Sequence, residues 1–244
     1  MLNNKIVIVT GAGGGIGKSI FLEIIRRGGF PIGIDITPLK DSPVYKELIM
    51  NNLSEKLYKY YNFDIRNIKK FKKVISSLNR IDGIVNNAAI LGSDNINDKN
   101  NWKEKMSVNV EAHYNIIKNS ISKMHTGASI VNIGSIELNR PEKNVVVYTS
   151  TKGALLGLTR AYSTTLASKN IRVNMVSPSR VFTEGNITRL KKDKYISYNT
   201  NNLMYSGKVE PIDVSNLVCF LLSNESIKIT GQNICIDCSF TLSR

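Results

Sequence analysis

A glycine-rich turn close to the N-terminus constrains the fold more than any other feature of this chain. The turn, Thr10-Gly-Ala-Gly-Gly-Gly-Ile-Gly17, follows a short run of mostly β-branched residues, Lys5-Ile-Val-Ile-Val9, and precedes an apolar helical pattern over residues 16–27. Glycines at such a turn let backbone N–H groups approach a phosphate, and the N-terminus of the following helix favours its negative charge. The segment therefore predicts a strand, a turn and a helix that together bind a nucleotide.

Apolar runs alternate with helical patterns along the rest of the chain. We expect strands over residues 31–35, 57–63, 81–85, 129–133, 171–176 and 233–236. We expect helices over residues 67–78, 101–124, 145–167 and 211–222. This alternation implies right-handed βαβ units, and strands that are apolar throughout belong to a parallel sheet covered by helices on both faces. The sequence predicts one α/β domain over residues 1–244, a Rossmann fold with a doubly wound parallel sheet of about seven strands.

The composition excludes several classes of protein. The 244 residues include 33 basic and 19 acidic side chains, a net charge of +14, but the lysines are spread along the chain and match no RNA-binding motif, so no nucleic-acid partner is expected. No apolar run reaches the roughly 18 residues of a membrane helix and no signal peptide is evident, which favours a cytoplasmic location without a membrane partner. Three cysteines and two distant histidines indicate neither a disulfide framework nor a metal site.

The glycine turn has two interpretations, of which the first is a phosphate-binding loop of the nucleotidase type. The segment from Ala12 to Ser19 resembles a relaxed P-loop, in which Lys18 would reach the phosphates and Ser19 would hold magnesium. That interpretation needs a metal-binding aspartate at the end of a later strand. Asp82 lies before its strand rather than after it, and Asp64 follows a strand but has no other feature of such a ligand.

The second interpretation is a dinucleotide site, which needs an acidic residue at the end of the second strand, about 20 residues after the glycines, to bind the ribose hydroxyls. Asp35 is at that position, twenty residues after Gly15. Its carboxylate would also repel the additional phosphate of NADP(H). The sequence therefore favours NAD(H), with NADP(H) as the weaker alternative.

A tyrosine and a lysine, Tyr148 and Lys152, lie four residues apart in a predicted helix, so their side chains share one face. Tyrosine ordinarily loses its proton near pH 10, at a pKa of about 10, and is a poor base at neutral pH. A nearby ammonium stabilises the phenolate and lowers that pKa. The pair predicts a general acid and base that works near neutral pH.

These motifs, in this order, resemble those of the short-chain dehydrogenase/reductase family from Lys5 to about Ser239. The glycine turn matches the family pattern Thr-Gly-x-x-x-Gly-x-Gly, and Asn86-Asn-Ala-Ala89 resembles the Asn-Asn-Ala-Gly motif that closes the cofactor pocket. Ser135 follows a predicted strand and precedes Tyr148 by thirteen residues, which is a usual family distance.

The resemblance implies a catalytic set made of Asn109, Ser135, Tyr148 and Lys152. Ser135 would stabilise charge on the substrate oxygen, and Tyr148 would give or take the hydroxyl proton. Lys152 would lower the pKa of the tyrosine and bind the nicotinamide ribose, while Asn109 would hold a water that links the lysine to solvent. The implied activity is NAD(H)-dependent interconversion of a secondary alcohol and a ketone.

The same resemblance implies a cofactor-binding set that extends over most of the chain, with Asp64 near the adenine and Thr183 at the nicotinamide amide. The set is Gly11, Gly14, Gly15, Ile16, Gly17, Asp35, Asp64, Ile65, Asn87, Ala88, Tyr148, Lys152, Pro178, Val181 and Thr183. It also implies a homotetramer or homodimer in which residues 101–124 and 146–168 pack across an interface.

The substrate is the least determined feature of the sequence. Arg140, Lys143 and Arg180 flank the implied site, and the polar, basic segment 184–208 is a candidate lid, which together favour an anionic or sugar-derived substrate. One alternative is a 3-oxoacyl thioester reductase that works on an acidic carrier protein. An alternative of another class is a catalytically idle NAD-binding regulatory protein.

Three positions depart from the family pattern. Ala89 replaces a glycine beside the cofactor, and Ser179 replaces one on the nicotinamide side. Cys238-Ser239 replaces a pair of glycines near the C-terminus. Since glycine permits backbone angles that other residues resist, the third departure leaves the local geometry there undetermined, and none of the three removes a catalytic group.

Overall fold

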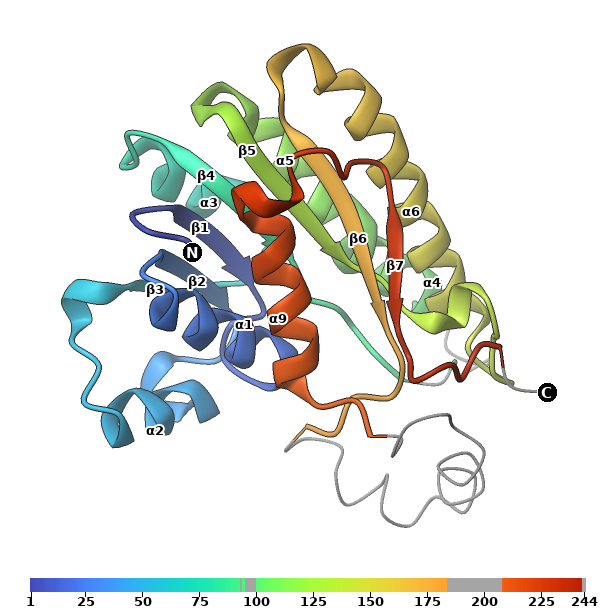
Figure 1. The fold of residues 1–244 in the computed structure, drawn as a ribbon. Coiled ribbons are helices and arrows are strands. Elements are labelled where there is room, and N and C mark those ends of the chain that lie inside the picture. The colour runs from blue at the N-terminus through green and yellow to red at the C-terminus, as the bar shows by residue number, and fades with distance from the viewer. Residues whose placement is uncertain (93, 95–99, 184–207, 243–244) are drawn as a thin grey trace.

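Seven parallel strands form one sheet in the order β3-β2-β1-β4-β5-β6-β7 (Figure 1). The computed structural model of the chain describes residues 1–92, 94, 100–183 and 208–242. The strands are β1 (Ile6–Thr10), β2 (Phe30–Asp35), β3 (Lys59–Asn62), β4 (Ile81–Asn86), β5 (Met124–Ile133), β6 (Arg172–Pro178) and β7 (Asn233–Ile236). The predicted Rossmann fold is confirmed.

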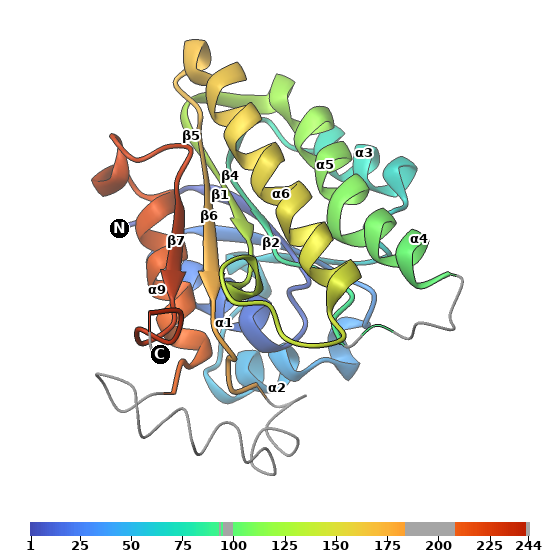
Figure 2. The same cartoon turned by 90° about the vertical axis from the view of Figure 1, so that its right-hand side faces the viewer.

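Helices cover both faces of the sheet (Figure 2). They are α1 (Gly15–Arg26), α2 (Pro43–Met50), α3 (Ile68–Ser76), α4 (Asn101–Met106), α5 (His113–Ser120), α6 (Val146–Thr165) and α9 (Pro211–Leu222). Helices α1 and α9 pack against each other on one face, while α3, α4, α5 and α6 lie on the other. Within the described ranges, no helix is both long and apolar enough to cross a membrane.

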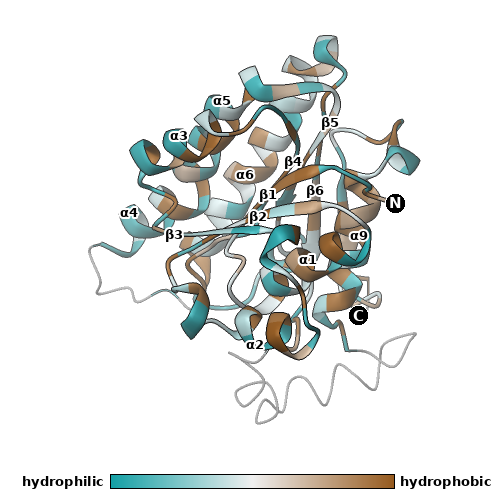
Figure 3. Cartoon of the chain, turned by 90° about the vertical axis from the view of Figure 1, so that its left-hand side faces the viewer, coloured by the Kyte–Doolittle hydropathy of each residue, from teal (hydrophilic) through white to brown (hydrophobic). Residues whose placement is uncertain are grey.

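The central strands are buried on both sides, because successive side chains point to opposite faces of the sheet and helices cover both faces. Val7 and Val9 of β1 join the core beneath α1 and α9, whereas Ile8 joins the core beneath α3 and α5. All three are fully buried, and each such side chain contributes about 1.5–3 kcal/mol. In Figure 3 the central strand β1 has the colour of apolar residues, whereas the edge strand β3 and much of α3 and α4 have that of polar residues.

Some elements differ from the sequence-based expectation. Helix α2 was not predicted, because it is short and buries only Val44 and Leu48. The predicted helix over 101–124 contains a π-helical segment, Ser107–Ala112, and its last residue, Met124, already begins β5. The candidate lid at 184–208 lies outside the described residues except for Lys208.

The strand order reverses beside β1, which pairs with β2 on one side and β4 on the other. In a doubly wound sheet, ligands bind outside the carboxyl ends of the strands at this switch point. The loops that follow β1, β4, β5 and β6 therefore meet around one crevice.

Candidate active site

The glycine turn after β1 packs closely against the loop that follows β4. Gly11 has a φ of +66°, and a Cβ there would lie 2.8 Å from Asn87 Nδ2. A Cβ on Gly17 would lie 2.6 Å from the same atom and would overlap the Gly11 carbonyl. Asn87 Nδ2 donates to Thr10 O at 3.0 Å and to Gly11 O at 3.2 Å. These contacts leave no space for side chains, so the turn presents its backbone to the cavity.

The hydroxyl of Thr10 joins the ends of the two central strands. It accepts hydrogen bonds from Asn87 N at 3.0 Å and Ala88 N at 3.1 Å, and it donates to Val85 O at 3.3 Å. Thr10, the first residue of the glycine motif, thus fixes the loop that carries the motif Asn86-Asn-Ala-Ala89.

Asp35 lies beneath the glycine turn at the end of β2. Its Oδ2 accepts a hydrogen bond from Gly13 N at 2.9 Å, and its Oδ1 accepts one from Thr37 N at 2.9 Å. This is the position that the dinucleotide interpretation requires. The P-loop interpretation is wrong, because Lys18 forms an ion pair with Glu47 and Ser19 shares a hydrogen bond with Ser215, so neither lines the cavity.

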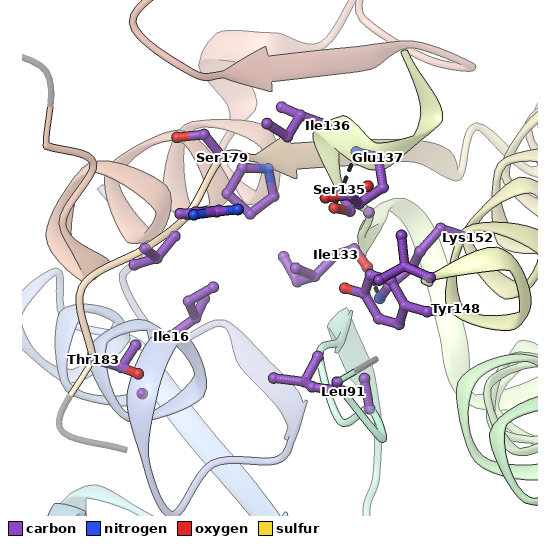
Figure 4. Close-up of a pocket in the computed structure, with 18 of the residues that line it drawn as sticks. Ile16, Leu91, Ile133, Ser135, Ile136, Glu137, Tyr148, Lys152, Ser179 and Thr183 are labelled. Carbon is purple, nitrogen blue, oxygen red and sulfur yellow. Dashed lines mark hydrogen bonds between the residues drawn. The ribbon is translucent and has the colours of Figure 1, made fainter. Parts of the chain in front are cut away.

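A cavity of about 550 Å³ opens between the glycine turn and the N-terminal part of α6 (Figure 4). Most of the predicted site residues line it: Gly11, Gly14, Gly15, Ile16, Asn87, Ala88, Ser135, Tyr148, Lys152, Pro178, Val181 and Thr183. The predicted residues outside its lining are Gly17, Asp35, Asp64, Ile65 and Asn109. Asp64 instead forms an ion pair with Arg66 at 2.6 Å.

Ser135, Tyr148 and Lys152 lie on one wall of the cavity, and the phenol of Tyr148 points into it (Figure 4). Lys152 Nζ donates to Ile133 O at 2.7 Å and lies 5.5 Å from the centre of the Tyr148 ring. Burial lowers the pKa of Lys152 to about 8. The sequence predicts a lowered pKa for Tyr148 as well, but burial raises that pKa to about 12, against the effect of the Ser135 hydroxyl. Desolvation of the phenolate outweighs the neighbouring groups, so the tyrosine holds its proton.

Asn109 is fully buried in the π-helical segment, a feature that is frequent at functional sites. Its Oδ1 accepts from Ile90 N at 2.8 Å, while its Nδ2 donates to Ile90 O at 3.1 Å and to Thr151 Oγ1 at 3.2 Å. The asparagine therefore holds the loop after β4 against α6. Sequence reasoning treats Thr151 as an ordinary helix residue, yet its hydroxyl completes this contact.

His113 is a further buried residue that sequence reasoning missed. Its Nε2 lies 2.8 Å from Ala88 O, and its Nδ1 is buried without a hydrogen-bond partner among the described residues. Burial, together with the charge of Lys152, lowers the pKa of His113 to about 3. The spacing could have indicated it, because His113 lies one helical turn after Asn109.

Asp94 lies in the loop after β4 and connects α4 to the start of α6. Its Oδ1 accepts from Lys105 Nζ at 2.7 Å, and its Oδ2 accepts from Val147 N at 2.6 Å, directly before Tyr148. The side chains of Lys105 and Asp94 are only 3% and 11% exposed. Burial opposes ionisation, but the Lys105 ammonium and the Val147 N–H together hold the pKa of Asp94 below its ordinary value. These contacts hold the first turn of α6 in place.

The outer rim of the cavity carries charges of both signs. Arg180 Nε donates to Glu142 Oε1 at 2.9 Å, and Glu142 N donates to Glu137 Oε2 at 2.6 Å. Arg140 instead donates to Phe240 O at 2.7 Å and lies over the Phe240 ring. Of the three basic residues that flank the implied site, Lys143 and Arg180 line the cavity and Arg140 does not.

Comparison with known proteins agrees with this geometry. Residues 11–241 match the family model described as enoyl-(acyl carrier protein) reductase. The chain belongs to the short-chain dehydrogenase/reductase family. Membership confirms the resemblance seen in the sequence.

Several members of the family are similar over nearly their whole length. D-xylose 1-dehydrogenase of Caulobacter vibrioides is 27% identical over 97% of this chain and 95% of its own. The 3-oxoacyl-(acyl-carrier-protein) reductase FabG of Thermotoga maritima is 30% identical over 97% of both chains. The structure of Thermoplasma acidophilum aldohexose dehydrogenase has a TM-score of 0.85 and 26% identity, covering 99% of this chain and 96% of its own.

The departures from the short-chain dehydrogenase/reductase pattern have different consequences. Ser179 lines the cavity and donates its N–H to Ile236 O at 2.9 Å, so the segment after β6 keeps its contact with β7. Cys238 and Ser239 adopt φ values of +50° and +66°, the left-handed conformation in which glycine is favoured. The backbone at Cys238 and Ser239 therefore has the conformation that glycine favours, although neither residue is a glycine.

Proposed function

We propose that this protein is an NAD(H)-dependent oxidoreductase that interconverts a secondary alcohol and a ketone. The observation that carries the proposal is that Ser135, Tyr148 and Lys152 converge on one wall of a cavity whose opposite wall is the glycine turn. A cradle in which added Cβ atoms would overlap the backbone fits the close approach of a pyrophosphate.

Each residue of the set has a distinct task. A nicotinamide cofactor, when bound, supplies or accepts the hydride. Ser135 hydrogen-bonds the substrate oxygen, and Tyr148, which holds its proton, donates it to that oxygen when a ketone is reduced. Lys152 contributes its charge behind the tyrosine and can bind the nicotinamide ribose, while Asn109 fixes the loop that closes the pocket.

Asp35 supports NAD(H) as the cofactor rather than NADP(H). Its carboxylate already accepts a hydrogen bond from the glycine turn, so a ribose hydroxyl can donate to an oxygen that is held in place. The additional phosphate of NADP(H) would bring negative charge to the same carboxylate. NADH should therefore bind more tightly than NADPH.

A sugar-derived substrate is supported by the similarity to D-xylose 1-dehydrogenase and to aldohexose dehydrogenase. A second candidate is reduction of a 3-oxoacyl thioester, which is favoured by the similarity to FabG and by the net charge of +14 toward an acidic carrier protein. Acetoacetyl thioesters tested with both cofactors distinguish the two. An idle regulatory protein is disfavoured, because the cavity retains Ser135, Tyr148 and Lys152.

A homo-oligomer, a tetramer or a dimer, is the proposed assembly. Trp102 of α4, Tyr114 of α5 and Val146 of α6 are 55%, 38% and 71% exposed on the layer of helices that the resemblance places at an interface. Large exposed apolar side chains of this kind often mark contact surfaces. A cytoplasmic location remains a prediction.

The proposal is tested by following NADH absorbance over a panel of alcohols and ketones with the wild type and Tyr148→Phe. General acid–base catalysis is worth about 10²- to 10⁴-fold, so turnover should fall by at least about 100-fold. NADH affinity should change little, because the ring remains in place. Turnover that survives in Tyr148→Phe would contradict the mechanism, and NADPH affinity equal to that for NADH would contradict the cofactor assignment.

A further inference from the structure

Glu137 extends into the cavity from the tight turn that follows the catalytic serine (Figure 4). The turn is a single 3-10 segment, Ile136–Leu138, and Ser135 Oγ accepts a hydrogen bond from Glu137 N at 3.2 Å. Because the backbone N–H of Glu137 donates to the serine hydroxyl, the position of the Glu137 side chain is fixed relative to that of Ser135. The sequence did not single out Glu137, and the family resemblance assigns it no role.

The carboxylate of Glu137 is anchored through one oxygen. Its Oε2 accepts a hydrogen bond from Glu142 N at 2.6 Å, whereas no donor among the described residues reaches Oε1. Burial raises the pKa of Glu137 and outweighs the hydrogen bond from Glu142 N–H, which lowers it; the charge of Glu142 raises it and that of Arg180 lowers it. A half-buried carboxylate with one unsatisfied oxygen is stabilised by a new hydrogen-bond donor.

The charge of Glu137 also reaches the reacting centre, because it adds to burial in raising the pKa of Tyr148. A substrate whose oxygen lies between Ser135 and Tyr148 therefore has this carboxylate close by. A carboxylate accepts hydrogen bonds and does not donate them. It attracts the hydroxyl groups of a neutral substrate and repels a substrate carboxylate or phosphate.

Arg180 moderates this preference without reversing it, because its charge lowers the pKa of Glu137 but burial outweighs that effect. Its guanidinium is bound to the carboxylate of Glu142, at 2.9 Å from Nε. The group next to the reacting centre is the Glu137 carboxylate.

We propose that Glu137 is a specificity-determining residue, whose Oε1 accepts a hydrogen bond from a second hydroxyl of a neutral polyhydroxylated substrate, a sugar or a polyol. The inference rests on the proposed function and narrows its substrate class. A hydrogen bond to a charged group contributes enough to change kcat/KM by about 10- to 100-fold. Substrates without the second hydroxyl lose that contribution.

The test uses matched substrate pairs with the full chain and saturating cofactor. The pairs are cyclohexane-1,2-diol with cyclohexanol, D-xylose with 2-deoxy-D-xylose, and D-glucose with D-glucuronate, which keeps the C1 hydroxyl and carries a carboxylate at C6. The wild type should prefer the diol and the sugar in every pair. Glu137→Gln should lower kcat/KM for the preferred member by about 10-fold or more and for the other member by less than about 3-fold. Glu137→Met removes both carboxylate oxygens. It should bring the ratio of kcat/KM between the two members of each pair close to one.

Glu55→Gln is the matched control, since it makes the same chemical change on an exposed residue and should leave every ratio unchanged. NADH affinity and the thermal midpoint check that the variants fold, and Glu137→Asp replaces either variant that does not. The shorter aspartate moves the carboxylate oxygen away from the substrate, so it should also reduce the ratio of kcat/KM between the two members of a pair.

Three outcomes overturn the inference. The first is a wild type that turns over both members of each pair equally, and the second is a preference that survives Glu137→Met. Equal losses on both members in Glu137→Gln would also overturn it, because they indicate a structural role. Failure of the wild type on every alcohol and ketone with either cofactor would instead overturn the proposed function.

Discussion

The two walls of the cavity are built in different ways. The wall at the glycine turn consists of backbone held by Thr10 and Asn87, and a side chain on Gly11 or Gly17 would collide with it. The opposite, substrate-facing wall depends on side chains that pair across segments far apart in the sequence: Glu137 lines it beside Ser135, Tyr148 and Lys152, and Asp94 supports it from outside the cavity at the start of α6. The comparison shows that one wall depends on the absence of side chains and the other on their pairing. The two walls should therefore respond differently to substitution.

The largest expected effect is on the substrate-facing wall. Asp94→Ala leaves the ammonium of Lys105 buried without its partner and frees the N–H of Val147. Breaking a buried ion pair on one side costs about 3–5 kcal/mol. We expect a loss of that size in the free energy of unfolding, measured by urea denaturation, together with lower turnover because α6 loses a contact beside Tyr148.

The double variant Asp94→Ala/Lys105→Met is the decisive comparison. It removes both charges and should recover most of the lost stability, since an apolar side chain can occupy the space of a buried lysine. Glu104→Ala serves as the control, because it breaks an exposed ion pair with Arg66 and should cost no more than about 1 kcal/mol. Equal losses in the double and single variants would show that the buried charge is not the cause.

A smaller effect is expected on the glycine wall. Gly17→Ala places a methyl group against the carbonyl of Gly11 and the amide of Asn87, so the turn must shift. Overpacking of this kind costs about 1–3 kcal/mol, and NADH affinity should fall by roughly 10- to 100-fold. The measurement is NADH titration by intrinsic or cofactor fluorescence.

Gly157→Ala is the matched control for that substitution. Gly157 lies in α6, and apart from its chain neighbours and the nearby backbone of that helix, no atom of the described residues lies within 4 Å of where its Cβ would stand. Alanine there should leave NADH affinity unchanged and should raise helix stability by about 0.5–1 kcal/mol. Unchanged NADH affinity in Gly17→Ala would mean that the cofactor tolerates a displaced turn.

The difference between the walls also explains what the sequence could predict. The glycine turn was predictable because close backbone packing permits only glycine at fixed spacings, and Ser135, Tyr148 and Lys152 follow a single predicted strand at spacings usual in the family. Asp94 and Glu137 were not predictable, because their partners, Lys105 with Val147 and Glu142, are set by loop conformations that no local pattern records. The direction of the Tyr148 pKa shift was missed because burial depends on the assembled cavity.

His113 lies where the two walls meet and gives the smallest expected effect. Its Nε2 must carry the hydrogen, because the carbonyl of Ala88 can only accept, and the buried Nδ1 is left as an unpaired acceptor. The pKa of His113, about 3 in the folded chain, lies below the value of about 6.5 for an unfolded chain. Between these values the unfolded state binds a proton that the folded state does not, so stability falls as the pH falls through that window. The slope is about 1.4 kcal/mol for each pH unit below 6.5.

His113→Gln removes this titration while its amide can still donate to Ala88 O. The free energy of unfolding, measured in urea at pH 7, 6 and 5, should therefore decline less steeply in the variant, by about 1.4 kcal/mol per pH unit once the pH is below 6.5. Identical slopes in the two proteins would mean that the folded chain accepts the proton, and that water reaches Nδ1. In that case solvent reaches the place where the two walls meet. The contact from His113 to Ala88 then cannot link the wall that carries the glycine turn to the wall that carries Lys152.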